Sequence, residues 1–460
     1  MPELTNSSTN HDNTPYIVMF QTLGCKVNRY ETDAVRQSFE ASGFCAQNEG
    51  EGHTCPDVYV LNTCTVTAEA DRKSRQMIRR AKKKYPGAIV VAMGCHVEML
   101  DGQSEADISI GTKNRLSAVR LAHELLEKRK FSQDPDATGF AYGEVYASGD
   151  RYQEFGPVLS QEDTRAYIKI EDGCDSFCSY CVIPYARGRV SSRETREVLR
   201  EAEELAGRGF REIVLTGIHI CSFGKDRGED ISALGDLLLG LEQIQGIERI
   251  RLGSLEPNSL TEDFVRRIAG MSKICPHFHI SLQSGSDGVL RKMNRKYDTK
   301  QYRECIGWLR RYFKDLSVGT DVIVGFPTET GEEHEESLVF CREIGFSGIH
   351  VFPFSERKGT KAAEMTPKVP QDIKLKRRDE FLVLAGGLAG AYGRTFVGQT
   401  VSVLLETVDE DGFFTGYTRD YVRVHIEPDV SLEKGNTVSV VVDSCAEGVL
   451  YGRTVSKIRD

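Results

Sequence analysis

The chain has 460 residues, of which 40% are hydrophobic and 28% charged, and its formal net charge is −9 at pH 7. This length allows roughly two to four domains with cores of their own. The longest apolar stretch, residues 381–393, is too short and too rich in glycine to span a bilayer. The first 14 residues are polar and lack the basic and apolar segments of a signal or transit peptide, so we expect a disordered tail, 1–14, and a cytoplasmic protein without membrane contact.

The order of apolar strands and amphipathic helices predicts an α/β protein in three folded parts. Residues 15–128 predict a small, doubly wound parallel sheet covered on both faces. Residues 129–164 are rich in Gly, Pro and Asp and predict a linker or an extended wrap. Residues 165–393 contain six strand–helix units, which predict a partial (β/α)6 barrel with its chemistry at the carboxyl-end loops. Residues 394–460 show short period-two strands and predict a small antiparallel β-barrel of a nucleic-acid-binding type.

Three cysteines follow the first strand of the predicted barrel: Cys174, Cys178 and Cys181, spaced C-x-x-x-C-x-x-C. Three thiolates at this spacing can hold three irons of one cubane iron–sulfur cluster and leave the fourth iron open to a second molecule. In a reducing cytosol the 13 cysteines of the chain stay free of disulfides and available as ligands. The alternatives are a zinc site, for which no further Cys or His follows until His219, and unpaired core thiols.

Three more cysteines stand at equivalent positions in the N-terminal part. Cys25, Cys64 and Cys95 each lie at or just past the end of a successive predicted strand. Because the carboxyl ends of parallel strands share one edge of a sheet, cysteines 39 and 31 positions apart can meet there. The pattern predicts a second cluster with three protein ligands, against the alternative of three separate buried thiols. Cys45 and Cys55 lack this placement, and we expect them to be structural.

Several polar residues end later strands on the same face of the predicted barrel, namely Glu256, Gln283, Ser284 and Asp321. Each alone suits a cap or a turn, but together they predict the shell around a ligand at the barrel mouth. His277 and His279 alternate on one strand, which is typical of packing rather than of a metal pair. Thr330 and Glu333 have the spacing of a capping box at the start of a helix.

Basic residues are concentrated in two segments, although the net charge is negative. Residues 72–84 hold eight Lys or Arg in thirteen positions, which suits either a phosphate-binding surface or a solvated helix face. Residues 187–196 ("RGRVSSRETR") form the second segment. In the C-terminal part, Tyr417, Tyr421, Arg419 and Arg423 form a candidate surface for stacking on RNA bases.

The motifs, taken in order, resemble those of one enzyme family. "TLGCKVNRYETD", "LNTCTVT" and "MGC", then the cysteine loop, then "RLGSLEP", "HISLQSGSDGVLRKMNRKY", "TDVIVGFPTET" and "HVFPFSERKGTKAA" are similar to the radical S-adenosylmethionine (SAM) methylthiotransferases in order and spacing. The resemblance covers the chain after the tail, including a C-terminal domain similar to the TRAM RNA-binding module. "TLGCKVNRYE" is most similar to the branch that acts on N6-threonylcarbamoyladenosine in tRNA. Sibling branches act on isopentenyladenosine in tRNA or on a ribosomal-protein aspartate.

The resemblance implies a methylthiotransferase with SAM and two [4Fe-4S] clusters. The cluster on Cys174, Cys178 and Cys181 would bind SAM at its open iron, and the cysteines at 25, 64 and 95 would hold the auxiliary cluster that supplies sulfur. The methylthio group would enter at carbon 2 of the modified adenosine next to the anticodon. Other classes of protein left open are a two-cluster electron carrier and an RNA-binding protein with structural clusters.

The resemblance also implies the surroundings of the cofactor and the partners. Tyr180, inside the cysteine loop, would pack near the adenine of SAM, and Glu256 and Asp321 would hold its ribose or methionine part, with Gln283 on the same rim. The expected partners are a tRNA anticodon loop, a flavodoxin- or ferredoxin-like electron donor and a sulfur donor system.

Overall fold

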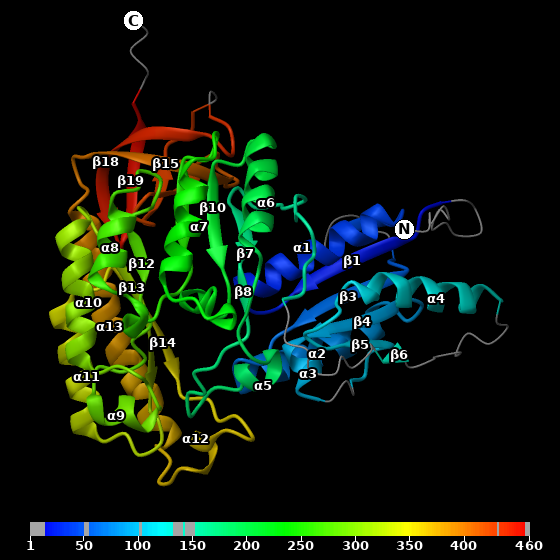
Figure 1. Cartoon of the computed structure of the whole chain (residues 1–460), viewed down its shortest axis with the longest axis horizontal. Helices are drawn as coiled ribbons and strands as arrows, with labels where there is room; N and C mark the ends of the chain where they lie inside the picture. Colours follow the sequence, from blue (N-terminus) through cyan, green and yellow to red (C-terminus); the bar gives the residue numbers. More distant parts are fainter. Residues whose placement is uncertain are drawn as a thin grey trace, which may run out of the picture.

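The structure is a computed structural model, and it describes residues 14–49, 55–100, 104–131, 141–142, 152–429 and 432–455. Figure 1 shows three assemblies: an N-terminal sheet, a central array of strands lined by helices, and a C-terminal β-barrel. The predicted tail, apart from Thr14, lies outside the described residues. Within the described part of the chain, no helix combines the length and the apolar character needed to cross a membrane.

The N-terminal sheet has the order β2-β1-β3-β4-β5-β6, with every neighbouring pair parallel. The first five strands have the doubly wound order 2-1-3-4-5, in which the chain reverses direction across the sheet between β1 and β3. Its elements are β1 (Ile17–Thr22), α1 (Lys26–Ala41), β2 (Cys45–Asn48), β3 (Val58–Thr63), α2 (Ala68–Lys84), β4 (Ile89–Gly94), α3 (Cys95–Glu98), β5 (Ile108–Ile110), α4 (Ser117–Phe131) and β6 (Ala141–Tyr142).

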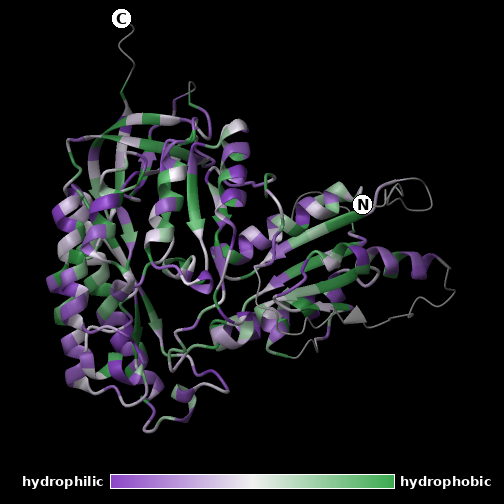
Figure 2. Cartoon of the chain, in the orientation of Figure 1, coloured by the Kyte–Doolittle hydropathy of each residue, from purple (hydrophilic) through white to green (hydrophobic). Residues whose placement is uncertain are grey.

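Both faces of this sheet are buried, as its continuous apolar strands predict. Val60 packs in a core with Phe39 of α1 on one face, and its neighbour Tyr59 packs with Ile78 of α2 on the other. Figure 2 shows hydrophobic colouring along most of these strands and hydrophilic colouring on the outer sides of the helices. The fold class predicted for this part is confirmed.

The central assembly is an open arc of six parallel strands. Two sheets, β11-β10-β7 and β12-β13-β14, are joined by isolated parallel bridges from Ile250 to Ile274 and from Leu255 to Ile280. The edges of this partial barrel are therefore β7 and β14. The strands are β7 (Ala166–Lys169), β10 (Glu212–Thr216), β11 (Arg249–Leu252), β12 (His277–His279), β13 (Ser317–Val324) and β14 (Gly348–Pro353).

Helices cover the outer side of the arc, as in Figure 1. The long ones are α6 (Thr195–Gly207), α7 (Ser232–Glu242), α8 (Glu262–Ala269), α10 (Thr299–Tyr312), α11 (Gly331–Ile344) and α13 (Gln371–Arg394). The shorter elements are β8 (Glu171–Asp172), β9 (Ser191–Ser192), α5 (Ile183–Arg187), α9 (Asp287–Lys292), α12 (Lys361–Glu364) and the 3₁₀ turns Ile220–Ser222, Lys225–Arg227 and Pro257–Ser259. The predicted capping box of α11 is confirmed, because Thr330 and Glu333 bond to each other's backbone N–H groups.

The strands of the arc turn apolar side chains outward and polar ones inward. Phe278, Val322 and Ile349 belong to the core shared with the helices. Because side chains alternate along a strand, the residues next to them face the lumen of the arc. The inward positions of the six strands are mostly polar or charged: Lys169, Glu212, Arg249, Arg251, His277, His279, Asp321 and His350.

The C-terminal assembly is a closed five-stranded barrel with the order β15-β16-β17-β19-β18, in which the pair β17–β19 is parallel and the others are antiparallel. Its strands are β15 (Thr400–Val408), β16 (Phe414–Thr418), β17 (Arg423–Ile426), β18 (Thr437–Ala446) and β19 (Val449–Thr454). The barrel covers the amino ends of the central strands: Arg249 donates to the carbonyl oxygens of Tyr417 (3.1 Å) and Ser402 (3.0 Å).

The predicted stacking surface for RNA bases is wrong for its two tyrosines. The rings of Tyr417 and Tyr421 stack on each other at 4.7 Å, and the guanidinium of Arg165 lies 5.1 and 5.0 Å from their centres. Arg251 lies 4.6 Å from the centre of the Tyr421 ring. Arg419 donates to the carbonyl oxygens of residues 272 and 274 in the central assembly. These side chains therefore join the C-terminal barrel to the central one.

Candidate active site

The loop that carries Cys174, Cys178 and Cys181 connects β8 to α5 at the carboxyl end of β7. Gly173 has φ +80°, and a Cβ there would lie 1.9 Å from the carbonyl oxygen of Arg189, so only glycine fits before Cys174. The Cys174 N–H donates to the Gly188 carbonyl (3.1 Å), which closes the loop. Burial raises the pKa of Cys181, and the neighbouring thiols of Cys178 and Cys174 add to the shift, so the three cysteines lie close together.

Arg295 is the main charged contact of this loop. Its guanidinium donates to the Sγ of Cys178 (3.3 Å) and to both carboxylate oxygens of Glu256 (2.6 Å each), and it lies 3.5 Å from the hydroxyl of Tyr180. The side chain of Arg295 is 5% exposed and that of Glu256 is 15% exposed. A charge-assisted pair of this kind fixes the guanidinium beside the sulfur. The arginine is placed to compensate the negative charge of a thiolate at Cys178.

A cavity of about 530 Å³ opens beside Cys178, and its wall includes Asp175, His219, Glu256 and Arg295. The Nε2 of His219 is buried without a hydrogen-bond partner within the described residues, while its backbone N–H donates to the Glu171 carboxylate (2.7 Å). A buried polar atom without a partner is costly. The cavity therefore has a wall with free hydrogen-bonding capacity for a polar ligand.

The second cysteine trio gathers at the edge of the N-terminal sheet where the chain reverses direction. Cys25 follows β1 and precedes α1, Cys64 follows β3, and Cys95 begins α3 directly after β4. Gly24 has φ +106°, and a Cβ there would lie 2.9 Å from the Cβ and 3.0 Å from the Sγ of Cys64. Burial raises the pKa of Cys64, and raises that of Cys95 to about 11, with the nearby Cys25 thiol adding to both shifts. The three thiols are therefore neighbours.

Both trios suit an iron–sulfur cubane better than a single ion. The donors are thiolates alone, the ligand type of iron–sulfur clusters. Around one tetrahedral zinc ion with Zn–S bonds of about 2.3 Å, the sulfurs would lie about 3.8 Å apart. In the part of the chain that the structure covers, no set of three cysteine sulfurs lies within 4.8 Å of one another. A single tetrahedral ion therefore fits either trio less well than a cluster does.

A buried network of charges lies between the two trios. Arg187, at the end of α5, donates to the Sγ of Cys95 (3.2 Å) and to carboxylate oxygens of Glu31 (2.9 Å) and Asp172 (3.0 Å). Lys169 contacts the same two carboxylates at 2.7 and 2.5 Å. Asp172 stands two positions before Cys174, and Arg187 stands six positions after Cys181. One guanidinium therefore links the cysteine loop of the central barrel to a cysteine of the other trio.

A second set of contacts ties the N-terminal sheet to the opposite edge of the arc. Arg357, beyond β14, pairs with Asp71 (2.6 Å) and donates to the hydroxyl of Thr65 (2.7 Å), next to Cys64 in sequence. Ser355 accepts from the N–H of Ala68 (2.9 Å). Because Lys169 belongs to β7, the N-terminal assembly bridges both edges of the partial barrel, and the cysteines after its strands face the open side.

The structure separates the predicted cofactor residues. Glu256 lines the cavity beside Cys178, and Tyr180 packs near the same arginine. Asp321 instead lies 3.3 Å from His279 on the inner face of the arc. Gln283 follows β12 with φ +69° and is held by backbone hydrogen bonds to β13. The roles expected for these four side chains toward SAM stay predictions.

Sequence reasoning missed the charged residues that join the two trios. Within the second basic segment, residues 187–196, Arg187 and Arg193 are each 1% exposed and paired with carboxylates, whereas the side chains of Arg189 and Arg196 are exposed. The burial and pairing of Glu31 could not be predicted either, because charged residues are common in the first turns of solvent-exposed helices. The sequence feature that points to this role is the position of Arg187, six residues after Cys181 of the cysteine loop.

The family comparisons agree with this geometry. Residues 168–341 match the model of the Radical SAM superfamily, and residues 17–110 match one described as "Uncharacterized protein family UPF0004". A solved structure of the radical S-adenosylmethionine methyltransferase TsrM from Kitasatospora setae is similar in fold, with a TM-score of 0.51 at 16% identity over 76% of this chain and 77% of that one. Fold and cysteine loop thus define a radical SAM enzyme, which implies a [4Fe-4S] cluster and SAM.

The chain is also similar to curated proteins over most of its length. It is 36% identical to the threonylcarbamoyladenosine tRNA methylthiotransferase MtaB of Bacillus subtilis, over 88% of this chain and 89% of the relative. It is 33% identical to the tRNA-2-methylthio-N(6)-dimethylallyladenosine synthase of Pelotomaculum thermopropionicum, over 94% and 96%. The chain belongs to the radical SAM methylthiotransferase family, enzymes that transfer a sulfur-containing group.

Proposed function

We propose that this enzyme inserts a methylthio group at carbon 2 of N6-threonylcarbamoyladenosine next to the anticodon of tRNA. The proposal is supported by the contact from Arg187 to the Sγ of Cys95, because the same guanidinium pairs with Glu31 and with Asp172, two positions before Cys174. An enzyme that joins a carbon radical to a sulfur needs its two centres close together and shielded from water.

In this proposal each trio holds one [4Fe-4S] cluster. Cys174, Cys178 and Cys181 hold the first, which when bound supplies the electron for reductive cleavage of SAM, and the cysteines at 25, 64 and 95 hold the auxiliary cluster. The cavity beside Cys178 has a volume, about 530 Å³, that suits a ligand of the size of SAM. Glu256 and Arg295 offer charges of both signs to its amino acid part, and Tyr180 is a candidate contact of its adenine.

The polarity of the lumen supports threonylcarbamoyladenosine over isopentenyladenosine. An isopentenyl group gains nothing from charged surroundings, whereas the threonyl group carries a carboxylate and a hydroxyl. His279 and His350 face the lumen, and Lys26, next to Cys25, is exposed, with its Nζ 6.0 Å from the centre of the Tyr421 ring. The ammonium of Lys26 is a candidate partner of the threonyl carboxylate. The Bacillus subtilis relative is named for the same nucleoside.

The partners follow from the same reaction. One exposed face of α2 carries Arg79, Arg80, Lys83 and Lys84, and it is a candidate contact for phosphates of the anticodon stem and loop. Arg79 and Lys84 already pair with Glu105 and Glu49, so this face is only moderately positive. A flavodoxin- or ferredoxin-like protein would supply electrons and a sulfur donor system would renew the transferred sulfur, in the cytoplasm, where tRNA is modified.

Two experiments test the proposal. Mass analysis of tRNA nucleosides from cells with and without this gene should show loss of the 2-methylthio form of N6-threonylcarbamoyladenosine alone. Loss of the 2-methylthio form of isopentenyladenosine, with the threonylcarbamoyl form intact, would assign the enzyme to the sibling branch.

The second experiment separates the two trios. Cys178→Ala should abolish 5′-deoxyadenosine production and retain the auxiliary cluster, whereas Cys25→Ala should retain 5′-deoxyadenosine production and lose methylthiolation. Cys45→Ala, at an exposed thiol outside both trios, is the matched control and should behave like the parent. Persistent 5′-deoxyadenosine production by Cys178→Ala would refute the assignment of the first trio.

A further inference from the structure

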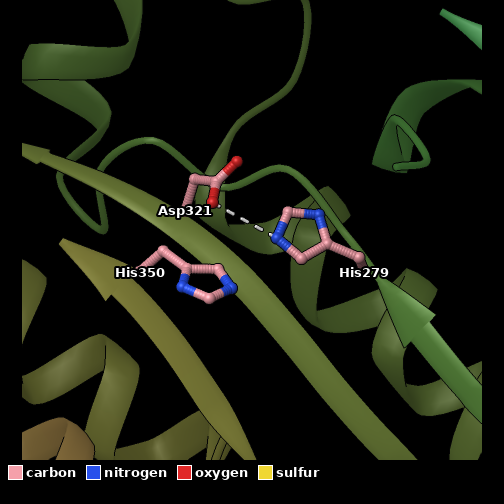
Figure 3. A group of neighbouring side chains, drawn as sticks. All are labelled: His279, Asp321 and His350. Carbon is pink, nitrogen blue, oxygen red and sulfur yellow. Dashed lines mark ion pairs between the residues drawn. The ribbon is translucent and has the colours of Figure 1, made fainter. Parts of the chain in front are cut away.

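A third group of ligand-type side chains lies in the lumen, apart from both cysteine trios. His279 on β12, Asp321 on β13 and His350 on β14 gather around one point (Figure 3). One ligand atom from each lies within 4.8 Å of the other two, and His279 Nε2 is 3.3 Å from Asp321 Oδ1. Across all the residues described, no other three side chains of His, Cys, Asp or Glu meet this condition.

The register of the strands explains why these three side chains meet. Asp321 and His350 are direct partners across β13 and β14, and His279 is the partner of Gly319, two positions before Asp321. Gly319 is in turn the partner of Gly348. A Cβ at Gly319 would lie 3.3 Å from the His279 ring, so glycine leaves the space that the ring occupies. The sheet thus brings three polar groups together beside two residues, Gly319 and Gly348, that carry no side chain.

The donor set suits a first-row divalent ion. Two imidazole nitrogens and one carboxylate oxygen are ligands that Zn²⁺, Fe²⁺, Co²⁺ and Ni²⁺ accept. Metal–ligand bonds of about 2.0–2.2 Å place donor atoms roughly 3 Å apart, close to the distance between His279 and Asp321. His350 is exposed and can turn toward the same point without repacking a core. Three protein ligands leave further coordination positions open to the lumen.

A neighbouring side chain orients one of the imidazoles. The Oγ of Ser254, just after β11, lies 3.0 Å from the Nδ1 of His279. This contact directs Nε2 of the ring toward Asp321. Ligating histidines commonly hold their second nitrogen in such a hydrogen bond, which fixes the ring and the tautomer. The tautomer in which Nδ1–H donates to Ser254 turns the lone pair of Nε2 toward the carboxylate, and this is the form that a cation between them requires.

We propose that His279, Asp321 and His350 bind one divalent transition-metal ion in the lumen of the partial barrel. An ion pair between His279 and Asp321 involves only two of the three side chains, and a ligand atom of His350, the partner of Asp321 across β13 and β14, lies within 4.8 Å of both. His277, two positions before His279, takes no part, because its ring packs on Tyr421 at 4.8 Å. The sequence pattern predicts a packing role for both histidines. The contact with Tyr421 agrees with that role for His277, whereas we propose a metal-binding role for His279.

The test uses the full-length protein with its clusters in place and Co²⁺ as the probe. Under anaerobic conditions the oxidised clusters are silent in electron paramagnetic resonance, so high-spin Co²⁺ is observed directly. After incubation and desalting, the parent should retain one cobalt per chain, with a signal distinct from that of aqueous Co²⁺. No tRNA or SAM is needed, so the outcome is independent of the proposed reaction.

Variants locate the bound ion. His350→Ala and Asp321→Asn should each weaken Co²⁺ binding roughly tenfold or more, with iron content unchanged. His425→Ala, on the C-terminal barrel beside Tyr451, is the matched control and should bind Co²⁺ like the parent. Retention of no cobalt by the parent would overturn the proposal. So would equal retention by the parent and His350→Ala, whose exposed side chain can be removed without disturbing the fold.

Discussion

The carboxylate of Glu31 is the group whose removal tests the ion network most directly. It is fully buried and pairs with Lys169 at 2.7 Å, Arg187 at 2.9 Å and Arg115 at 3.0 Å. Glu31→Gln keeps the shape of the side chain and removes the negative charge. Lys169, Arg187 and Arg115 then have Asp172 as their only nearby buried carboxylate in this network of described residues. The contact between the N-terminal and central assemblies loses its central anion.

The size of the effect follows from the pKa of this carboxyl group. Burial alone would raise it, but the charges of Arg115, Arg187 and Lys169 more than reverse this and lower the pKa of Glu31 to about 2. Against an ordinary value near 4.5, the shift corresponds to about 3 kcal/mol. Removing one partner of a buried ion pair costs a similar amount, about 3–5 kcal/mol. We therefore expect a destabilisation of about 3 kcal/mol.

The direction in which the Glu31 contribution to stability changes with pH determines the pH at which the variant should be assayed. A folded pKa below the unfolded one contributes stability that is present above about pH 4.5 and is lost as the pH falls toward 2. At pH 7 the full contribution is present. Thermal unfolding of the reconstituted protein at pH 7 should show a midpoint roughly 3 °C lower for Glu31→Gln than for the parent.

The control variant is Glu343→Gln, which breaks an exposed pair with Arg303 (2.8 Å) and should leave the midpoint within about 1 °C. Limited proteolysis of the same samples should show faster cleavage between the N-terminal and central assemblies in Glu31→Gln only. If Glu31→Gln unfolds within about 1 °C of the parent and is cleaved at the same rate, the network does not join the two assemblies as argued.

Two further substitutions test the local geometry and the electrostatics of the N-terminal assembly. Gly24→Ala should lower the iron content by about half, because φ at this position is +106° and the new Cβ would lie 2.9 Å from the Cβ of Cys64. The control is Gly87→Ala, which has open space around it and should keep the full iron content. Equal iron content in both variants would contradict the argument. Asp33→Asn should raise the unfolding midpoint increasingly from about pH 4 to pH 7, and by a nearly constant amount above that. Burial raises the pKa of Asp33 to about 7, so the parent loses about 4 kcal/mol as the pH rises from about 4 to 7, and parallel pH profiles of parent and variant would refute this.

Local sequence rules were sufficient for much of the fold. Continuous apolar strands and period-3.6 helices predicted the parallel sheet and the six-stranded arc, because these patterns depend only on which faces are buried. The capping box at Thr330 and Glu333 was equally predictable, since both partners lie within four residues. The positions of Cys25, Cys64 and Cys95 after successive strands also implied their meeting, because parallel strands end at one edge of the sheet.

Contacts between assemblies could not be predicted in this way. Arg187 looked like an exposed basic residue, and Tyr417 and Tyr421 looked like a surface for RNA, yet each is part of an interface. A charged or aromatic side chain gives the same local signal on a free surface as in a buried pair, and only its distant partner distinguishes the two.

The sequence by itself determined where the ligand cysteines stand relative to the strands and which faces of the elements are apolar, because both are properties of short segments. Only the tertiary structure decided that Glu31 and Arg187 join the two trios, and that His279 meets Asp321 and His350. These partners are 156, 42 and 71 positions apart in the chain, and their meeting depends on the register of the strands and the docking of whole assemblies.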